Sequence, residues 1–238
     1  MLGSRPLGAI GALSAVVLFG LAACGSNAAD SYKTTDPTTI ASDAHAALTA
    51  TTGIRLTGTI QLGSEAVTVD LTSDLTGAVT GTATIEGAAV QVLGTGGKAG
   101  KVYLKGGPDF WSKIAPQYAS RLVDKWVLNV VPLPPVIQQL TLPKLIQNEA
   151  KYAWEKESPQ VVGTGNVNGA PTVQITVSDS LSGARETLDV SATDPHHVLR
   201  ESEPSQFTLT FDRFGATVRA PAPAASEVVD LVKVIATK

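Results

Sequence analysis

Apolar and polar side chains alternate along three neighbouring segments in the first half of the chain. The pattern begins in GIRLTGTIQLG, where apolar side chains recur from Ile54 to Leu62, and it repeats in AVTVDLTSD and AVTGTATIEG. A period of two residues with one polar face predicts antiparallel strands with one face in water and the other covered. The dipeptides Gly63-Ser64 and Glu86-Gly87 separate these segments and are typical of tight hairpin turns.

The same alternation returns after residue 170. The segments PTVQITV, ETLDVSA, HVLRESE and FTLTFDRFGATV follow one another at hairpin spacing. In the first of them Val173, Ile175 and Val177 share one face. Asn168-Gly169 and Ser182-Gly183 are typical turn dipeptides. A second group of antiparallel strands is therefore predicted here.

Between the two strand groups, residues 108–154 change to helical spacing. Apolar and aromatic residues from Phe110 to Leu122 recur three and four positions apart, with a break at Pro116. The following stretch, VPLPPVIQQLTLPKLIQNEAKYAW, is apolar and interrupted by prolines, which favours two short helices. All three tryptophans lie in this insert.

One further helix is predicted at each end of the domain. Asp36-Pro37 is typical of a helix start, and an apolar face follows it up to a predicted end near Gly53. Near the C-terminus, Ser226 is the expected cap of a last helix. The apolar residues expected to face inward on that helix are Val228, Leu231, Val232 and Ile235.

The elements follow one another in the order helix, strands, helical insert, strands and helix, and this order predicts the fold class. The protein is expected to be α+β, with ten or more antiparallel strands, apolar on one face, that curl around the helices. Residues 36–238 contain no internal boundary and are expected to form a single domain. If the helices do not fill the space under the sheet, that space is a ligand pocket.

The N-terminal residues have the layout of a secretory signal. Arg5 supplies positive charge, Leu7 to Leu21 carry none, and Leu21-Ala22-Ala23 lead into Cys24. As a permanent membrane span this run is marginal, because a span needs about 20 apolar residues. A Leu-Ala-Ala-Cys ending resembles the lipobox of bacterial lipoproteins, in which the cysteine is acylated and becomes the first residue. The alternative is an ordinary signal peptide with a chance cysteine.

This interpretation divides the chain into three parts. Residues 1–23 are the expected lipoprotein signal peptide, and residues 24–35 are the acylated Cys24 with a flexible tether, since GSNAADSYKTT is small and polar. Because Cys24 is the single cysteine, no intrachain disulfide is available to the exported domain, and its core alone must stabilise it. Two acyl chains anchor a protein stably, whereas one is marginal.

Composition and motifs argue against several other functions. A net charge of -3 with scattered lysines and arginines gives no basic surface for nucleic acid. GTGGKA, residues 94–99, fits a dinucleotide-binding pattern but precedes a strand instead of the required helix. His196-His197 after Asp194 lack further ligands at a suitable spacing and are interpreted as a turn, not a metal site. No nucleophile motif is present, so no enzyme activity, cofactor or metal is predicted.

The layout as a whole resembles a known family. The lipobox ending in Cys24, the segments KVYLKGGPDFWSKI and LVDKWVLNV, and the ending VRAPAPAASEVVDL are similar to the mycobacterial LppX/LprG (LprAFG) lipoproteins, whose domain is LolA-like. The resemblance implies a curved half-barrel sheet wrapped around helices, with an apolar cavity for acyl chains. It also implies binding and carriage of lipids or lipoglycans to the cell envelope, often beside a membrane transporter. The prolines Pro132, Pro134 and Pro135 are expected to shape the cavity mouth.

The expected cavity walls come from the sheet and from the insert. For any single residue of the insert a plain core position is the better explanation, but together with the facing sheet residues they are the predicted lipid-binding set. The sheet wall is Leu56, Ile60, Val69, Leu71 and Ile85. The insert wall is Phe110, Trp111, Ile114, Tyr118, Val136, Ile137 and Leu140.

Three functions remain as hypotheses. The first is a lipid-binding carrier anchored through Cys24 on the extracytoplasmic face of the cell membrane of a high-GC Gram-positive bacterium. The second is a lipoprotein with a filled core that acts as a scaffold or as an accessory partner of a membrane transporter. The third, a polar-solute binding protein, is disfavoured because β-α-β alternation is absent from the sequence.

Overall fold

A computed structural model describes residues 24–97, 100–128, 130, 137–152, 154–156, 158–178 and 184–237. Residues 1–23, which carry the predicted signal peptide, lie outside these ranges. The same holds for Val136, for Pro132, Pro134 and Pro135, and for the predicted turn Ser182-Gly183. The side chain of Cys24 is likewise outside the description, although its backbone begins the first helix.

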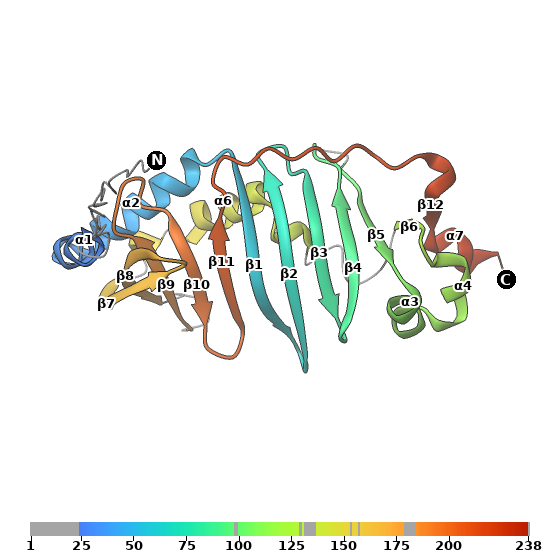
Figure 1. Cartoon of the computed structure of the whole chain (residues 1–238), viewed down its shortest axis with the longest axis horizontal. Helices are drawn as coiled ribbons and strands as arrows, with labels where there is room; N and C mark the ends of the chain where they lie inside the picture. Colours follow the sequence, from blue (N-terminus) through green and yellow to red (C-terminus); the bar gives the residue numbers. More distant parts are fainter. Residues whose placement is uncertain are drawn as a thin grey trace, which may run out of the picture.

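One open sheet of 12 strands dominates the fold (Figure 1). Its spatial order is β12-β6-β5-β4-β3-β2-β1-β11-β10-β9-β8-β7, and every neighbouring pair is antiparallel except β12–β6. The strands in chain order are β1 (Gly53–Leu62), β2 (Glu65–Asp74), β3 (Val79–Ile85), β4 (Ala88–Gly94), β5 (Val102–Gly106), β6 (Trp126–Leu128), β7 (Gln160–Val167), β8 (Ala170–Ser178), β9 (Arg185–Ser191), β10 (Val198–Glu203), β11 (Phe207–Asp212) and β12 (Val228–Asp230). This open, curved sheet confirms the predicted α+β class.

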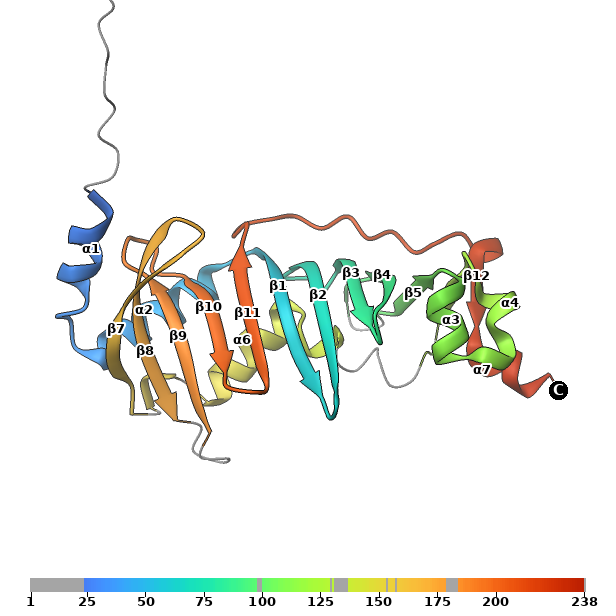
Figure 2. The ribbon, with the colours of Figure 1, turned by 60° about the horizontal axis from the view of Figure 1, so that its bottom comes forward.

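Helices α2 and α6 lie along one face of the sheet, and α3, α4 and α7 gather at its β6 end (Figures 1 and 2). The described helices are α1 (Cys24–Tyr32), α2 (Pro37–Ala50), α3 (Pro108–Ile114), α4 (Ala119–Leu122), α6 (Leu142–Tyr152) and α7 (Leu231–Ala236), with 3-10 turns at Pro116–Tyr118, Trp154–Lys156 and Ala225–Glu227. The backbone N–H of Leu142 donates to Ser73 Oγ at 3.1 Å, which fixes the start of α6 on β2.

The strand register aligns the apolar positions into rows across the covered face. In one row, each residue faces the next on the neighbouring strand from β11 to β12. It consists of Phe211, Leu56, Leu71, Gly81, Val92, Leu104, Val127 and Val229. Because residues that face each other across strands pack on the same side, the alternation seen in the sequence becomes one continuous apolar surface.

The β4–β6 end of this surface is tightly packed, and we call it the filled end. Helix α3 packs against β4 and β5 and brings Phe110 and Trp111 onto them. Their rings meet edge to face with centroids 4.8 Å apart, and both side chains are at most 1% exposed. A Cβ at Gly106 would overlap the ring of Phe110, so this glycine is what allows the ring to lie on β5.

The opposite face of the central strands carries charges. Arg55 donates from Nε and Nη2 to both carboxylate oxygens of Asp70, each at 2.8 Å, and its Nη1 lies 3.2 Å from Asp212. The hydrogen bond from Arg55 holds the pKa of Asp70 below its ordinary value. The predicted polar face is therefore confirmed here.

Asp189 organises the same face at the β8–β10 end. It is 1% exposed and accepts hydrogen bonds from Thr172, Gln174 and Arg200 at 3.0, 3.0 and 2.8 Å. A buried carboxylate with this many donors is satisfied, since buried charge needs pairing and hydrogen bonds. Strands β8, β9 and β10 are thereby cross-linked from outside.

The turns and the first long helix form as the sequence predicts. The hairpin turns lie at Gly63-Ser64, Glu86-Gly87 and Asn168-Gly169, and the last two pairs have positive φ at both residues, as type I′ turns require. Asp36 caps α2 by accepting hydrogen bonds from the backbone N–H groups of Thr38 and Thr39.

Residues 24–32 are more ordered than the predicted flexible tether. They form α1, which packs against β7 and β8 and buries Ala29. Tyr32 ends this helix, and its hydroxyl donates to Asp43 at 2.8 Å while its ring stacks on His196 with centroids 4.1 Å apart. These tertiary contacts explain why a small, polar segment is helical.

The predicted C-terminal helix is wrong in its start and in its buried face. Residues Val228–Asp230 instead form β12, parallel to β6, and Asp230 rather than Ser226 caps α7 through Val232 N–H. Pairing with β6 satisfies the backbone hydrogen bonds of these residues, so the helix begins only at Leu231. The later start changes which side of the helix faces the core: Leu231 is buried, whereas Val232 and Ile235 are exposed.

Candidate functional site: an apolar pocket under the sheet

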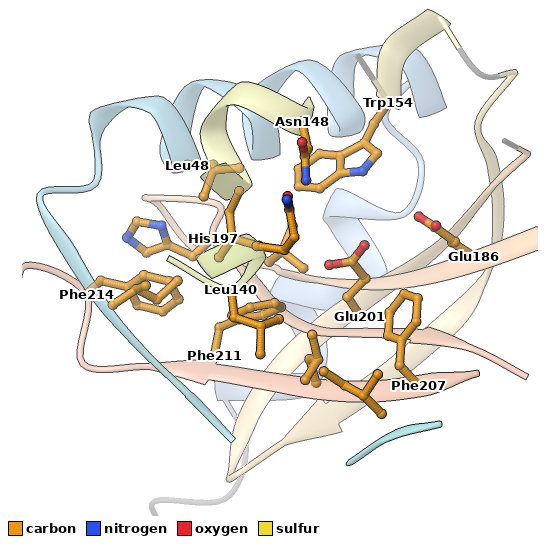
Figure 3. Close-up of a pocket in the computed structure, with 16 residues that line it drawn as sticks. Leu48, Leu140, Asn148, Trp154, Glu186, His197, Glu201, Phe207, Phe211 and Phe214 are labelled. Atoms are coloured by element: carbon orange, nitrogen blue, oxygen red, sulfur yellow. The ribbon is translucent and has the colours of Figure 1, made fainter. Parts of the chain in front are cut away.

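A pocket of about 630 Å³ lies between the covered face of the sheet and the helices (Figure 3). Its volume falls in the range of about 300–1,000 Å³ typical of sites for small ligands. We call this region, around β1 and β9–β11, the pocket end. The residues that line it are mostly hydrocarbon or aromatic, with a few polar groups.

The sheet supplies one wall of the pocket. Strand β1 contributes Ile54 and Ile60, and β11 contributes Phe207, Leu209 and Phe211 at alternate positions. Because alternate residues of a strand share a face, β11 directs all three side chains to the same side. The register places Phe207 opposite Ile60, so the two strands form one apolar floor.

The helical segments supply the opposite wall. Leu48 comes from the end of α2, Leu145 and Asn148 from α6, and Leu140 from the turn before α6. Trp154 follows α6 and is 8% exposed. In Figure 3 the labelled side chains of this wall face those of β11 across the cavity.

His197 and Phe214 close one side of the pocket. Their rings stack with centroids 3.8 Å apart and planes inclined by 5°. Burial lowers the pKa of His197, while nearby Asp194 acts in the opposite direction. The imidazole is therefore held neutral at neutral pH and behaves as part of the aromatic wall.

Four polar side chains complete the lining. Gln139 and Asn148 lie on the helical wall and are exposed. Glu186 from β9 and Glu201 from β10 are half-buried and reach the pocket from the sheet. The pocket thus combines an apolar body with a small polar region, which is the usual composition of a ligand site.

Seven of the twelve predicted lipid-binding residues form two groups. Ile60 and Leu140 line the pocket. Leu56, Val69, Leu71 and Ile85 lie buried on the same covered face of the sheet, and Ile137 is buried in the same core, but none of these five is part of the lining.

Four of the other predicted residues lie away from the pocket. Phe110, Trp111, Ile114 and Tyr118 belong to α3 and the turn after it, at the filled end. Val136 lies outside the described residues. Whether any of these residues contacts a ligand remains a prediction.

Several lining residues were not anticipated from the sequence. Phe207, Leu209 and Phe211 alternate with polar residues in FTLTFDRF, so the sequence alone is enough to place all three on one face of a strand. The sequence predicts a plain turn at His197, and only the tertiary stacking on Phe214 brings its ring to the pocket. Glu186 and Glu201 carried no sequence signal, since charged residues on strands usually face water.

Other kinds of site find no support in the described part of the chain. Within those ranges, no three His, Cys, Asp or Glu side chains gather in a group that could hold a metal ion. From Cys24 onward, the described helices include none long and apolar enough to cross a membrane.

The fold and the pocket define a class of protein: an open, curved sheet folded over helices that leave an apolar pocket beneath it. No protein-family model matches the chain, and a search of curated proteins gives no match. Among solved structures it is similar to the lipoprotein LppX from Mycobacterium tuberculosis, at 15% identity and a TM-score of 0.51, over 79% of this chain and 100% of that chain.

LprF from Mycobacterium bovis is similar to the same degree, at 16% identity and a TM-score of 0.52, over 79% of this chain and 97% of that chain. The chain therefore has an LppX-like fold, which confirms the fold that the sequence resemblance implied. At these identities the similarity establishes the fold alone.

Proposed function

We propose that this protein is a lipoprotein that binds lipids or lipoglycans by their acyl chains in the pocket and carries them to the cell envelope. It acts as a binding protein and not as an enzyme. The observation that carries the proposal is the pocket of about 630 Å³ whose two facing walls are mainly hydrocarbon and aromatic. The fold similarity to the lipoprotein LppX supports it.

The energetics are adequate for binding without strong polar contacts. Burying about 14 methylene groups of a palmitoyl chain, at roughly 0.8 kcal/mol each, gives on the order of 10 kcal/mol. Association costs of several kcal/mol offset part of this gain. With an association cost of about 4 kcal/mol, about 6 kcal/mol remains, which corresponds to a Kd of tens of micromolar, since a Kd of about 1 μM is about -8 kcal/mol.

We also propose that residues 1–23 are removed and that acylated Cys24 anchors the protein at the extracytoplasmic face of the cell membrane. The Leu21-Ala22-Ala23-Cys24 sequence after an uncharged apolar run supports this. Helix α1 starts at Cys24 and packs on β7 and β8, so the anchor would join the domain, residues 36–238, through a docked helix.

Co-purifying lipid tests the proposed binding directly. Native mass spectrometry and lipid extraction on residues 25–238, purified from the native host, should find lipid in stoichiometric amount. Ile60→Trp places an indole in the pocket and should abolish the bound lipid. Thr59→Trp, on the other face of the same strand, is the matched control and should keep it.

A clean apo mass that takes up no added phospholipid or acylglycerol contradicts the carrier. That result favours the alternative, a scaffold or accessory partner of a membrane transporter. The anchor is tested separately by the mass of the N-terminal peptide of the membrane-bound protein. It should start at Cys24 and carry acyl chains, and Cys24→Ala should release the protein from the membrane fraction.

A further inference from the structure

Two adjacent histidines in the loop between β9 and β10, residues 192–197, contact different parts of the molecule. His197 lines the pocket and stacks on Phe214, with ring centroids 3.8 Å apart (Figure 3). His196 stacks on Tyr32, the last residue of α1, with centroids 4.1 Å apart and planes inclined by 8°. One short loop is therefore held between a wall of the pocket and the helix that follows the predicted anchor.

The backbone of this loop connects the two stacks. His196 Nδ1 donates a hydrogen bond to the carbonyl oxygen of Ser191, at the end of β9, at 2.9 Å. The N–H of His197 donates to Pro195 at 2.7 Å, and its carbonyl oxygen accepts from the N–H of Ser191 at 2.8 Å. Because a single planar peptide unit joins the two histidines, a displacement of His196 also moves His197.

Phe214 is the fixed side of the inner stack. The N–H of the next residue, Gly215, donates to the carbonyl oxygen of Gly53 at 2.7 Å, which joins this segment to the start of β1. A Cβ at Gly53 would overlap the carbonyl oxygen of Ala216, so the absence of a side chain lets the two segments lie this close. The sheet thus holds Phe214, and the position of the wall depends on the histidine side.

Tyr32 holds the histidine side from outside the pocket. Its hydroxyl donates to Asp43 on α2 at 2.8 Å, and burial together with this hydrogen bond raises the pKa of Tyr32, so the hydroxyl stays a donor. Helix α2 continues to Leu48, which lines the pocket. Tyr32 therefore contacts two segments that line the pocket, the β9–β10 loop and α2, although Tyr32 is not itself a lining residue.

We propose, building on the proposed lipid-binding function, that Tyr32 is a positioning residue for the lipid pocket. Docked α1 holds His196 through Tyr32, and His196 keeps the His197–Phe214 wall closed beside a bound acyl chain. The helix next to the predicted anchor thereby controls how fast lipid leaves, and displacement of α1 from β7 and β8 loosens the wall.

The rate of lipid release tests this role. Pyrene-labelled hexadecanoic acid bound to the purified protein is transferred to excess phosphatidylcholine vesicles, and stopped-flow fluorescence follows its departure. Tyr32→Ala and His196→Ala each remove the outer stack. Each should speed release by about threefold to tenfold, the range expected from the loss of one aromatic pair.

A conservative variant and a neighbouring variant separate this role from a general loss of stability. Tyr32→Phe keeps the ring on His196 and loses the hydrogen bond to Asp43, and its release rate should stay close to that of the unaltered protein. The matched control, Lys33→Ala, removes the ion pair with Asp30 at the same end of α1 and should leave the rate unchanged. If Tyr32→Ala folds poorly, His196→Ala tests the same stack from the loop side.

Nuclear magnetic resonance of the histidine rings gives a readout that needs no lipid. The chain has three histidines, so substitution of His45 and His196 in turn identifies the signals of His197. Stacking on Phe214 shifts the ring protons of His197 upfield, and burial lowers its pKa. In Tyr32→Ala both should move toward the values of an exposed histidine, whereas a residue that only stabilises the fold would leave them unchanged.

The two readouts distinguish failure of this inference from failure of the proposed function. If Tyr32→Ala releases the probe at the unaltered rate and keeps the His197 signals, the inference is overturned while lipid binding stands. Either change without the other also overturns it, because release and wall position are then unconnected. If the unaltered protein binds no probe, the proposed function fails and control of release fails with it, whereas the His197 signals still show whether Tyr32 positions the wall.

Discussion

The filled end and the pocket end of the same sheet carry similar apolar side chains but are covered in different ways. At the filled end, helix α3 inserts Phe110 and Trp111, which are almost completely buried. At the pocket end, the buried residues of α2 are Ile40 and three alanines, while Phe207 and Phe214 stay partly exposed. The size of the covering side chains, and not the apolar character of the sheet, determines where a cavity remains.

The largest expected contrast is in stability after aromatic deletion at the two ends. Trp111→Ala should lower the free energy of unfolding by about 3–5 kcal/mol, because the site is fully packed. Phe207→Ala should lower it by less than about 2 kcal/mol, since the ring already borders a cavity. Urea unfolding of both variants measures the difference.

Lipid uptake should respond in the reverse order. Phe207→Ala should weaken binding of an alkyl probe, whereas a folded preparation of Trp111→Ala should bind it as the unaltered protein does. Equal losses of stability in the two variants would contradict the distinction between a filled end and a pocket end.

Adding a large side chain should distinguish the packed centre of the sheet, at Ala83 on β3, from the pocket end by a smaller amount. Ala83→Trp overpacks a position that is 2% exposed between Val69 and Val90, and it should cost about 1–3 kcal/mol or more of stability. Ile60→Trp extends into the pocket and should change stability by less than about 1 kcal/mol while blocking uptake. Thermal unfolding followed by circular dichroism compares them, and a larger cost for Ile60→Trp would show that the pocket has no room.

The smallest expected effect is the pH dependence of stability from His197. Its pKa is depressed by burial from the ordinary value of 6.5, so the unfolded chain binds the proton more tightly. The contribution of neutral His197 to the free energy of unfolding is fully present above about pH 6.5 and is lost as the pH falls through the depressed folded-state pKa. His197→Phe keeps the ring against Phe214 and should flatten the profile between pH 7 and 5.

The sequence predicts the strands well where one face is covered and the other is wet. Period-two alternation identifies β1–β3 and β8–β11, and turn dipeptides mark the hairpins between several of them. The three-residue strands β6 and β12 were not predicted, since each is too short to carry a pattern and depends on pairing with a distant partner.

The candidate site is less predictable than the fold. Alternation places Leu56 and Ile60 on the same covered face, but only Ile60 borders the cavity, because the distinction depends on what α2 and α6 leave unfilled. Glu201 faces inward only because a bulge changes the strand phase, and His197 reaches the pocket only through a tertiary stack. None of these features is encoded in local sequence.

The tryptophans give the most direct test of where an acyl chain binds. Trp154 lines the pocket, whereas Trp111 on α3 and Trp126 on β6 lie in the filled end. The measurement is quenching of tryptophan fluorescence by a bromine-labelled hexadecanoyl glycerol, compared between the unaltered domain and Trp154→Phe. Saturable quenching is expected in the unaltered domain, and Trp154→Phe should abolish it. Quenching that persists in Trp154→Phe would place the chain at the filled end and contradict the assignment of the pocket as the lipid site.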